Sequence, residues 1–219
     1  MNIYNRLGKN SIIAILLLAL TSCKQNTERT INENASVEVK EIILDTIIEI
    51  DQKTNYKKRI LKDSAYISNG FDFPVGKPNA NGYYNAQKFQ ENNHLGDDWN
   101  GVGGGNSDLG DSIYAIANGY ISETKDYEGG WGNVVRIVHL YDGKLYESLY
   151  AHCDTIVVEQ NQFIKKGEQF ATIGNCNGAY YAHLHLELRD SVDLDIGGGY
   201  STDTTGYLNP TEFITINRK

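Results

Sequence analysis

Four of the five histidines in this chain lie in three short segments that could supply ligands to one metal ion. His94 precedes Asp98 in the segment HLGDD, where Gly96 permits a tight bend that could aim both side chains at one point. His183 and His185 alternate with leucines in AHLHLEL, so a strand would turn both imidazoles to one face and the leucines to the core. Imidazole nitrogens with a carboxylate oxygen are a ligand set that suits zinc.

The remaining segment is YAH, which places His152 at the end of an expected strand over residues 144–152. A period of two predicts that His152 shares one face of this strand with Tyr146, Ser148 and Tyr150. Each histidine segment alone is common by chance. Three of them in one domain, each at a turn or a strand end, indicate a common site.

Two nearby residues leave alternatives open. Asp97 could replace Asp98 as the ligand, although Trp99 directly after Asp98 suggests that Asp98 turns inward. His139 lies in the middle of an expected strand between apolar residues, and we interpret it as a packing histidine or as a support behind a ligand.

The composition favours a β-rich fold, because 22 Gly and 15 Tyr accompany only three Pro and one Met. The turn dipeptides Asn118-Gly119 and Asp142-Gly143 each predict a two-residue hairpin. We therefore expect an all-β domain, an antiparallel sheet of meander or sandwich-like form with an open substrate groove. Its expected strands span residues 112–117, 120–124, 133–141, 144–152, 155–158, 168–173 and 183–189.

The N-terminus predicts export. Arg6 and Lys9 precede an apolar run over residues 12–20, which is too short to span a bilayer. The next residues, LTSC, resemble the bacterial lipobox, in which the thiol of the cysteine, here Cys23, is lipidated. An ordinary cleaved signal with a chance cysteine is the alternative. Acyl chains on Cys23 would anchor the protein to a membrane.

The chain is expected to have three parts: a lipoprotein signal peptide (1–22), a lipidated tether (23–68) and one catalytic domain (69–219). The tether is polar except for an apolar patch over residues 42–50, which predicts a short strand or helix. Glycine, aromatic and β-branched residues dominate after the tether. The formal net charge of −8 argues against nucleic-acid binding.

The ordered set HxGxD, YxH and HLHxEL resembles the M23 zinc metallopeptidases, whose domain is called lysostaphin-like or LytM. The similarity covers about residues 71–213 and includes DLGDSIYAIANGYI, GGWGNVVRIVH and FIKKGEQFATIG. It implies one zinc ion held by His94, Asp98 and His185. It also implies that His152 and His183 are a catalytic pair.

Three protein ligands leave a fourth position open for water, as in catalytic zinc sites. His152 and His183 could then take a proton from the attacking water and return one to the leaving amine, in an order that the sequence leaves open. The family often uses an upstream tyrosine as oxyanion donor, which makes Tyr83 and Tyr84 candidates. Glu187 either orients a ligand imidazole from behind or is simply solvated.

We therefore expect a zinc endopeptidase that cuts stem or cross-bridge peptides of peptidoglycan. The alternative is a catalytically silent LytM-like activator or regulator of another cell-wall hydrolase, and a zinc hydrolase with a substrate outside the wall is a third hypothesis. The expected location is the cell envelope, lipid-anchored and periplasmic or associated with the outer membrane. A regulatory protein partner is left open.

Two further features have open or negative interpretations. Cys153 and Cys176 flank the expected site and could either pair or stay reduced in an oxidising envelope. The run over residues 101–105, GVGGG, is not expected to bind phosphate, because no strand precedes it and no helix signal follows it. We interpret this run as a loop at the groove rim.

Overall fold

The computed structural model describes residues 35, 37–48 and 51–219, and it divides into the compact units Met1–Gln52 and Lys53–Lys219. The signal peptide expected over residues 1–22 and the lipidated Cys23 lie outside the described residues. The expected boundary between tether and domain at residue 68 stays a prediction.

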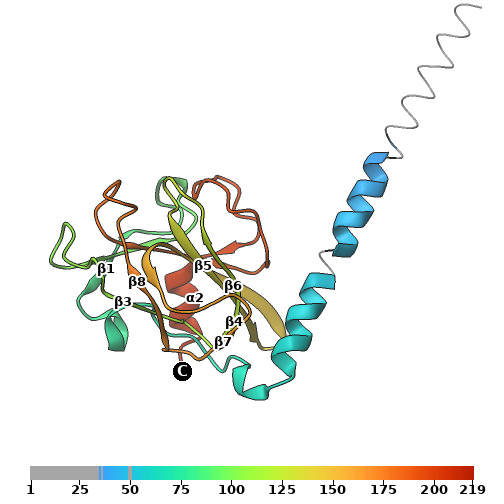
Figure 1. The fold of residues 1–219 in the computed structure, drawn as a ribbon, viewed down its shortest axis with the longest axis horizontal. Coiled ribbons are helices and arrows are strands. Elements are labelled where there is room, and N and C mark those ends of the chain that lie inside the picture. The colour runs from blue at the N-terminus through green and yellow to red at the C-terminus, as the bar shows by residue number, and fades with distance from the viewer. Residues whose placement is uncertain (1–34, 36, 49–50) are drawn as a thin grey trace, which may run out of the picture. The chain divides into compact units, whose positions relative to one another are not determined.

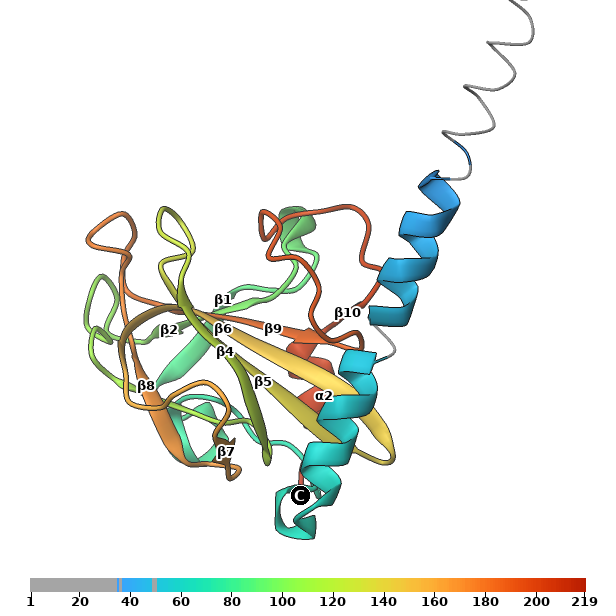
Figure 2. The same cartoon turned by 45° about the vertical axis from the view of Figure 1, so that its right-hand side comes forward.

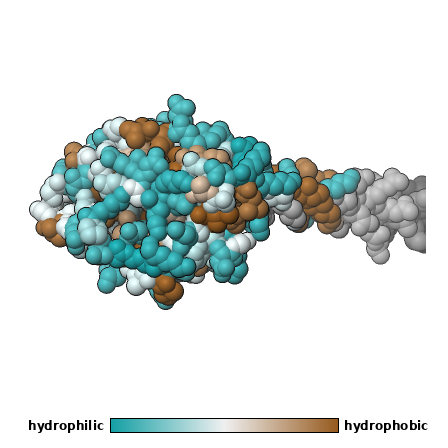
Figure 3. Space-filling model, turned by 90° about the horizontal axis from the view of Figure 1, so that it is seen from below, coloured by the Kyte–Doolittle hydropathy of each residue, from teal (hydrophilic) through white to brown (hydrophobic). Residues whose placement is uncertain are grey.

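In the first unit, residues 37–48 are helical, so the apolar patch forms a helix over its described part. Its aliphatic side chains are exposed, and apolar atoms appear at the surface of this segment in Figure 3. Among residues 35, 37–48 and 51–219, no helix is long and apolar enough to cross a membrane. A second helical stretch, residues 51–61, begins at the end of the first unit and lies mostly in the second.

The second unit is built on an antiparallel sheet, which confirms the predicted fold class (Figures 1 and 2). Along its main path the strand order is β1-β2-β9-β6-β5-β4-β7, while β10 pairs with β9 and β8 pairs with β6 and β3. The strands are β1 (Tyr83–Gln87), β2 (Asp97–Gly101), β3 (Ser112–Tyr114), β4 (Gly119–Asp126), β5 (Asn133–Tyr141), β6 (Lys144–Ile156), β7 (Phe163–Ile164), β8 (Gln169–Ile173), β9 (Leu184–Arg189) and β10 (Tyr207–Leu208). The helical elements are η1 (Ser64–Tyr66), η2 (Gly76–Ala80), η3 (Glu91–Asn93) and α2 (Pro210–Ile216).

One of the two predicted hairpins is confirmed and the other is wrong. Strands β5 and β6 form a hairpin around Asp142 and Gly143, whose φ angles of 48° and 74° suit a two-residue turn. Asn118-Gly119 joins no hairpin, because β3 pairs with β8 while β4 pairs with β5 and β7. The Asn118 side chain instead donates to the carbonyls of Ala65 and Ile67, which ties this turn to the segment before the sheet.

Strand β9 lies between β2 and β6 and carries the predicted alternation. Its three leucines belong to the main hydrophobic core, whereas His185, Glu187 and Arg189 point to the opposite face. The register places His185 directly opposite Asp98 on one side and Ala151 on the other. Residues of three strands therefore meet at His185.

The predicted face of His152 is wrong. Tyr150 is fully buried in the main core, and strict alternation would place His152 there too. Instead His152 has a left-handed backbone with a φ of 60°, and the β6–β8 pairing is irregular just beyond it. This kink puts Cys153 into the core and turns His152 to the face of His185.

Helix α2 lies against one face of the sheet (Figures 1 and 2). Asn209 caps its first turn, and Pro210 follows at a position that suits proline. Buried Asp97 ties the helix to β2, because its carboxylate accepts from the backbone N–H and the hydroxyl of Thr211. The same carboxylate accepts from the N–H of Phe89.

His139 is a core histidine. Its Nδ1 lies 2.9 Å from the carbonyl oxygen of Asn118, and its Nε2 lies 2.7 Å from the hydroxyl of Ser148. Since a carbonyl only accepts, Nδ1 carries the proton and the ring is neutral. Burial lowers the pKa of His139 to about 4.

We predict that His139 destabilises the protein in mild acid. The folded pKa of about 4 lies below the unfolded value of about 6.5, so its contribution is complete above pH 6.5 and is lost as the pH falls through 4. The difference corresponds to about 3 kcal/mol. Urea unfolding at pH 7, 6, 5 and 4 should give a steeper loss of stability for the wild type than for His139→Gln. Equal slopes for both proteins would contradict this account.

Candidate metal and catalytic site

Three ligand atoms from β2, β9 and the segment before β2 converge on one point. The Nε2 of His94 lies 2.9 Å from the Nδ1 of His185, and the Asp98 Oδ1 lies 3.3 Å and 3.0 Å from these two nitrogens. Both imidazoles are buried, while the Asp98 side chain keeps 14% exposure. These three residues form a group that could hold a metal ion.

The spacing of the ligand atoms fits zinc. A tetrahedral site with bonds of 2.0–2.1 Å separates its ligand atoms by about 3.3 Å, close to the distances among these three atoms. The alternation along β2 explains why Asp98 rather than Asp97 belongs to the group. Asp97 and Trp99 are buried on the core side, whereas Asp98 faces the other way.

The unused nitrogen of His185 is fixed from behind. Its Nε2 lies 3.3 Å from Glu187, whose other carboxylate oxygen accepts 2.9 Å and 2.5 Å hydrogen bonds from Arg189. An acceptor at Nε2 assigns the proton to that nitrogen and leaves the Nδ1 lone pair for a metal. Glu187 is fully buried, so it is not a solvated surface residue. The buried Nδ1 of His94 has no such partner within the described residues.

Without a metal, the group shares a proton. Burial raises the pKa of Asp98, but the hydrogen bonds from His185 and His94 outweigh burial and hold that pKa well below its usual range. Burial lowers the pKa of His185, yet its bonds to Asp98 and Glu187 raise it to about 9. A bound cation must displace this proton, so metal affinity depends on pH.

His152 and His183 lie beside the group with their rings 4.6 Å apart. A backbone carbonyl orients each ring. The Nδ1 of His183 lies 2.8 Å from the Tyr181 carbonyl oxygen, and the Nδ1 of His152 lies 3.3 Å from the Trp131 carbonyl oxygen. Carbonyls only accept, so both protons are on Nδ1 and both Nε2 lone pairs are free. Burial, followed by His183 and His185, lowers the pKa of His152 to about 3, which keeps this ring neutral.

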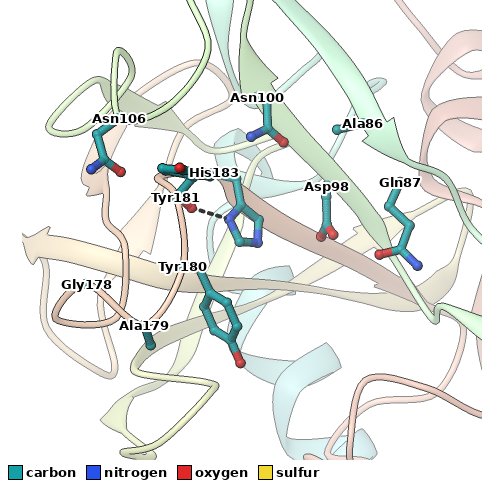
Figure 4. Close-up of a pocket in the computed structure, with 10 residues that line it drawn as sticks. All are labelled: Ala86, Gln87, Asp98, Asn100, Asn106, Gly178, Ala179, Tyr180, Tyr181 and His183. Carbon is teal, nitrogen blue, oxygen red and sulfur yellow. Dashed lines mark hydrogen bonds between the residues drawn. The ribbon is translucent and has the colours of Figure 1, made fainter.

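A groove passes the site on both sides. One compartment of about 690 Å³ and another of about 490 Å³ share Gln87, Asp98, Tyr180 and His183. In the first, His183 and Asp98 point toward the same space, and Tyr180 lies below His183 in the view of Figure 4. The described residues that line either compartment include no lysine or arginine.

The two predicted oxyanion donors are not brought to the metal group. The Tyr83 hydroxyl donates to Asp111 at 2.5 Å, and the exposed Tyr84 lines neither compartment. Two other tyrosines flank the site and were missed in the sequence. The ring of Tyr180 lies 5.5 Å from that of His152, and the ring of Tyr200 lies 5.1 Å from that of His94. Both come from loops whose path no local pattern predicts.

The two cysteines of the described part are free thiols. Cys153 is buried, and burial raises its pKa to about 12. Cys176 lies at the site, with its sulfur 3.2 Å from the Nδ1 of His152. This contact was not predicted, because it depends on the path of the turn after β8, which has no periodic pattern.

An antiparallel sheet with a group that could hold a metal ion and two adjacent histidines defines a β domain with a candidate metal site, and comparisons with known proteins give its family. The model of peptidase family M23 matches residues 98–196. Lipoprotein NlpD of Yersinia enterocolitica is 38% identical over 80 residues, which cover 36% of this chain and 78% of that protein. The chain belongs to peptidase family M23.

Two further proteins are similar to this chain, one in sequence and one in fold. Murein hydrolase activator NlpD of Escherichia coli K12 is also 38% identical over 80 residues, but these cover only 20% of that protein and 36% of this chain. A chain in the crystal structure of the SpoIIIAH and SpoIIQ complex has a TM-score of 0.50 at 17% identity, covering 65% of this chain and 99% of that one. This second likeness concerns the fold alone.

We predict that loss of Asp98 impairs metal binding, whereas loss of the adjacent Asp97 impairs stability. Asp98→Ala should weaken zinc binding by more than about 100-fold, because it removes a ligand. Asp97→Ala should keep one zinc per chain but lose about 2–3 kcal/mol, because three partly buried donors lose their acceptor. Zinc content after dialysis, chelator competition and urea unfolding would measure both effects. Equal zinc loss in the two variants would count against the assignment.

Proposed function

We propose that the protein is a zinc-dependent endopeptidase that hydrolyses peptide bonds in the stem or cross-bridge peptides of peptidoglycan. One observation carries this proposal: a three-ligand group and two imidazoles with free Nε2 atoms face the same groove. In this proposal His94, Asp98 and His185 hold one zinc ion. When bound, zinc supplies a Lewis acid that polarises a carbonyl and acidifies water.

The two remaining histidines are the proposed proton carriers. His152 is neutral, so its Nε2 can accept the proton of the attacking water. His183 lines the groove, and its free Nε2 can take up a proton from solvent and then pass it to the leaving amine. Neither tyrosine predicted from the sequence reaches the site, so Tyr180 and Tyr200 are the better candidates to donate a hydrogen bond to the oxyanion.

The groove and the relatives support a wall peptide as substrate. An open groove that continues on both sides of His183 suits an extended chain better than a small molecule. Relatives of this chain are bacterial lipoproteins, and one is named a murein hydrolase activator. We therefore propose attachment to the cell envelope through a lipid on Cys23, on the periplasmic side or at the outer membrane.

A second candidate function is activation of another murein hydrolase. The names of the curated relatives favour this alternative over catalysis, whereas the complete ligand group favours catalysis. A domain that only docks onto a partner needs neither a metal nor free imidazole lone pairs. The two functions therefore make different demands on His183.

We expect the purified, zinc-loaded full chain to release soluble fragments from isolated peptidoglycan. His152→Ala and His183→Ala should each lower the release rate by about 100-fold to 10,000-fold, because each removes a proton carrier. Both variants should keep one zinc per chain, and Lys144→Ala at the exposed β5–β6 turn should match the wild type. Mass spectrometry of the fragments identifies the bond that is cut. Undiminished release by both histidine variants would refute this mechanism.

The activator candidate predicts another result. If the protein acts only by activation, the wild type alone releases nothing, and wild type and His183→Ala stimulate a purified murein hydrolase from the same cell equally. If the protein is a peptidase, release by the wild type alone persists without the second enzyme. Assays with each protein alone and with both together distinguish these cases.

A further inference from the structure

We propose that Cys176 is a positioning residue that sets the tautomer of His152 through a contact between its sulfur and Nδ1. This inference rests on the proposed function, in which His152 accepts a proton at Nε2. The sulfur lies 3.2 Å from Nδ1, and no other side chain within the described part of the chain has a hydrogen bond to the His152 ring.

The backbone on both sides of this contact is in an unfavourable conformation. His152 has a φ of 60°, Cys176 a φ of 50° and Asn177 a φ of 57°, all in the left-handed region that residues other than glycine seldom adopt. Such conformations cost about 1–3 kcal/mol each and persist only where the surroundings enforce them. Here they bring together an imidazole from within β6 and a thiol from the turn after β8.

The loop before β5 admits the thiol. Gly132 has a φ of 57°, and a β-carbon there would lie 3.0 Å from the Cys176 sulfur. A larger residue at position 132 would therefore push the sulfur away from His152. The backbone N–H of His152 also donates to the Trp131 carbonyl at 3.1 Å, so the same loop holds both the ring and the main chain of His152.

Two carbonyls leave one consistent arrangement of protons. The Trp131 carbonyl accepts from Nδ1–H at 3.3 Å, which is long for such a bond, and the Gly130 carbonyl accepts from the Cys176 S–H at 3.5 Å. The thiol proton is thereby directed away from the imidazole, and a sulfur lone pair faces Nδ1–H. Burial raises the pKa of Cys176, so the group stays a neutral thiol.

This arrangement has a consequence for His152. The Nδ1–H group of His152 points to two acceptors, the Trp131 carbonyl oxygen and the Cys176 sulfur. Both acceptors stabilise the tautomer with its proton on Nδ1. The Nε2 of His152 then keeps its lone pair. Within the described structure, this atom has no hydrogen-bond partner and is not fully buried. Without the sulfur, one long hydrogen bond alone opposes the alternative tautomer, which carries its proton on Nε2 and cannot act as a base.

The test is the tautomer itself, read from two-bond ¹H–¹⁵N spectra of imidazoles in the zinc-loaded, ¹⁵N-labelled full chain. The wild type should show His152 as the Nδ1–H form only, and Cys176→Ala should show a mixture. Release of peptidoglycan fragments by Cys176→Ala should fall by about tenfold at unchanged zinc content. Cys176→Ser should restore both, because a hydroxyl can accept from Nδ1–H and donate to Gly130.

Cys153→Ala is the matched control. This neighbouring thiol contacts the carbonyl of Tyr150 at 3.7 Å and not the His152 ring, so its loss should leave the tautomer unchanged. An unaltered His152 spectrum in Cys176→Ala would overturn the inference, as would a serine variant as impaired as the alanine variant. If even the wild type releases no fragments, the proposed function fails, and the spectra still decide the role of Cys176.

Discussion

The geometry of the metal group depends on one buried side chain, that of Arg189, which has no solvent exposure. Its guanidinium donates to Glu187 at 2.5 Å and to Glu147 at 3.1 Å, and Glu187 contacts His185 in turn. Removing one partner of a buried ion pair costs about 3–5 kcal/mol. The orientation of His185 is therefore fixed by Glu187, which is itself held by Arg189. The same network reaches the loop after β9, because Glu147 accepts from the N–H of Asp193.

The register between β2 and β9 places Asp98 next to His185. His185 is directly opposite Asp98 on β2, so a slip of one residue would turn Asp98 toward the core and replace it with a neighbour. The Gly199 carbonyl accepts from the N–H of Leu95 at 2.9 Å, which fixes the segment that carries His94. Two of the three proposed ligands thus depend on pairing within the sheet, and the third depends on a loop that the charge network helps to hold.

Local rules predicted those parts that local geometry decides. Period two in AHLHLEL placed His185 and the leucines on opposite faces of β9, and Asp142-Gly143 specified its hairpin. The rules failed where distant contacts override them. His152 leaves the alternation of β6 because its N–H and ring bind to the loop before β5, and Asn118 bonds to the chain before the sheet instead of turning a hairpin. Loop residues such as Tyr200 carry no periodic signal at all.

The face of the sheet that carries the histidines contains several features that cost folding stability. Arg189 is fully buried between two carboxylates, and His152 has a left-handed backbone. Each feature destabilises the fold unless its partners are all present, and each acts on the same few atoms around His185. Cys176 adds a third cost at the same point, since its own backbone is left-handed as well. Strain and buried charge therefore converge on this face, and together they hold the imidazoles of His152 and His185 in fixed positions.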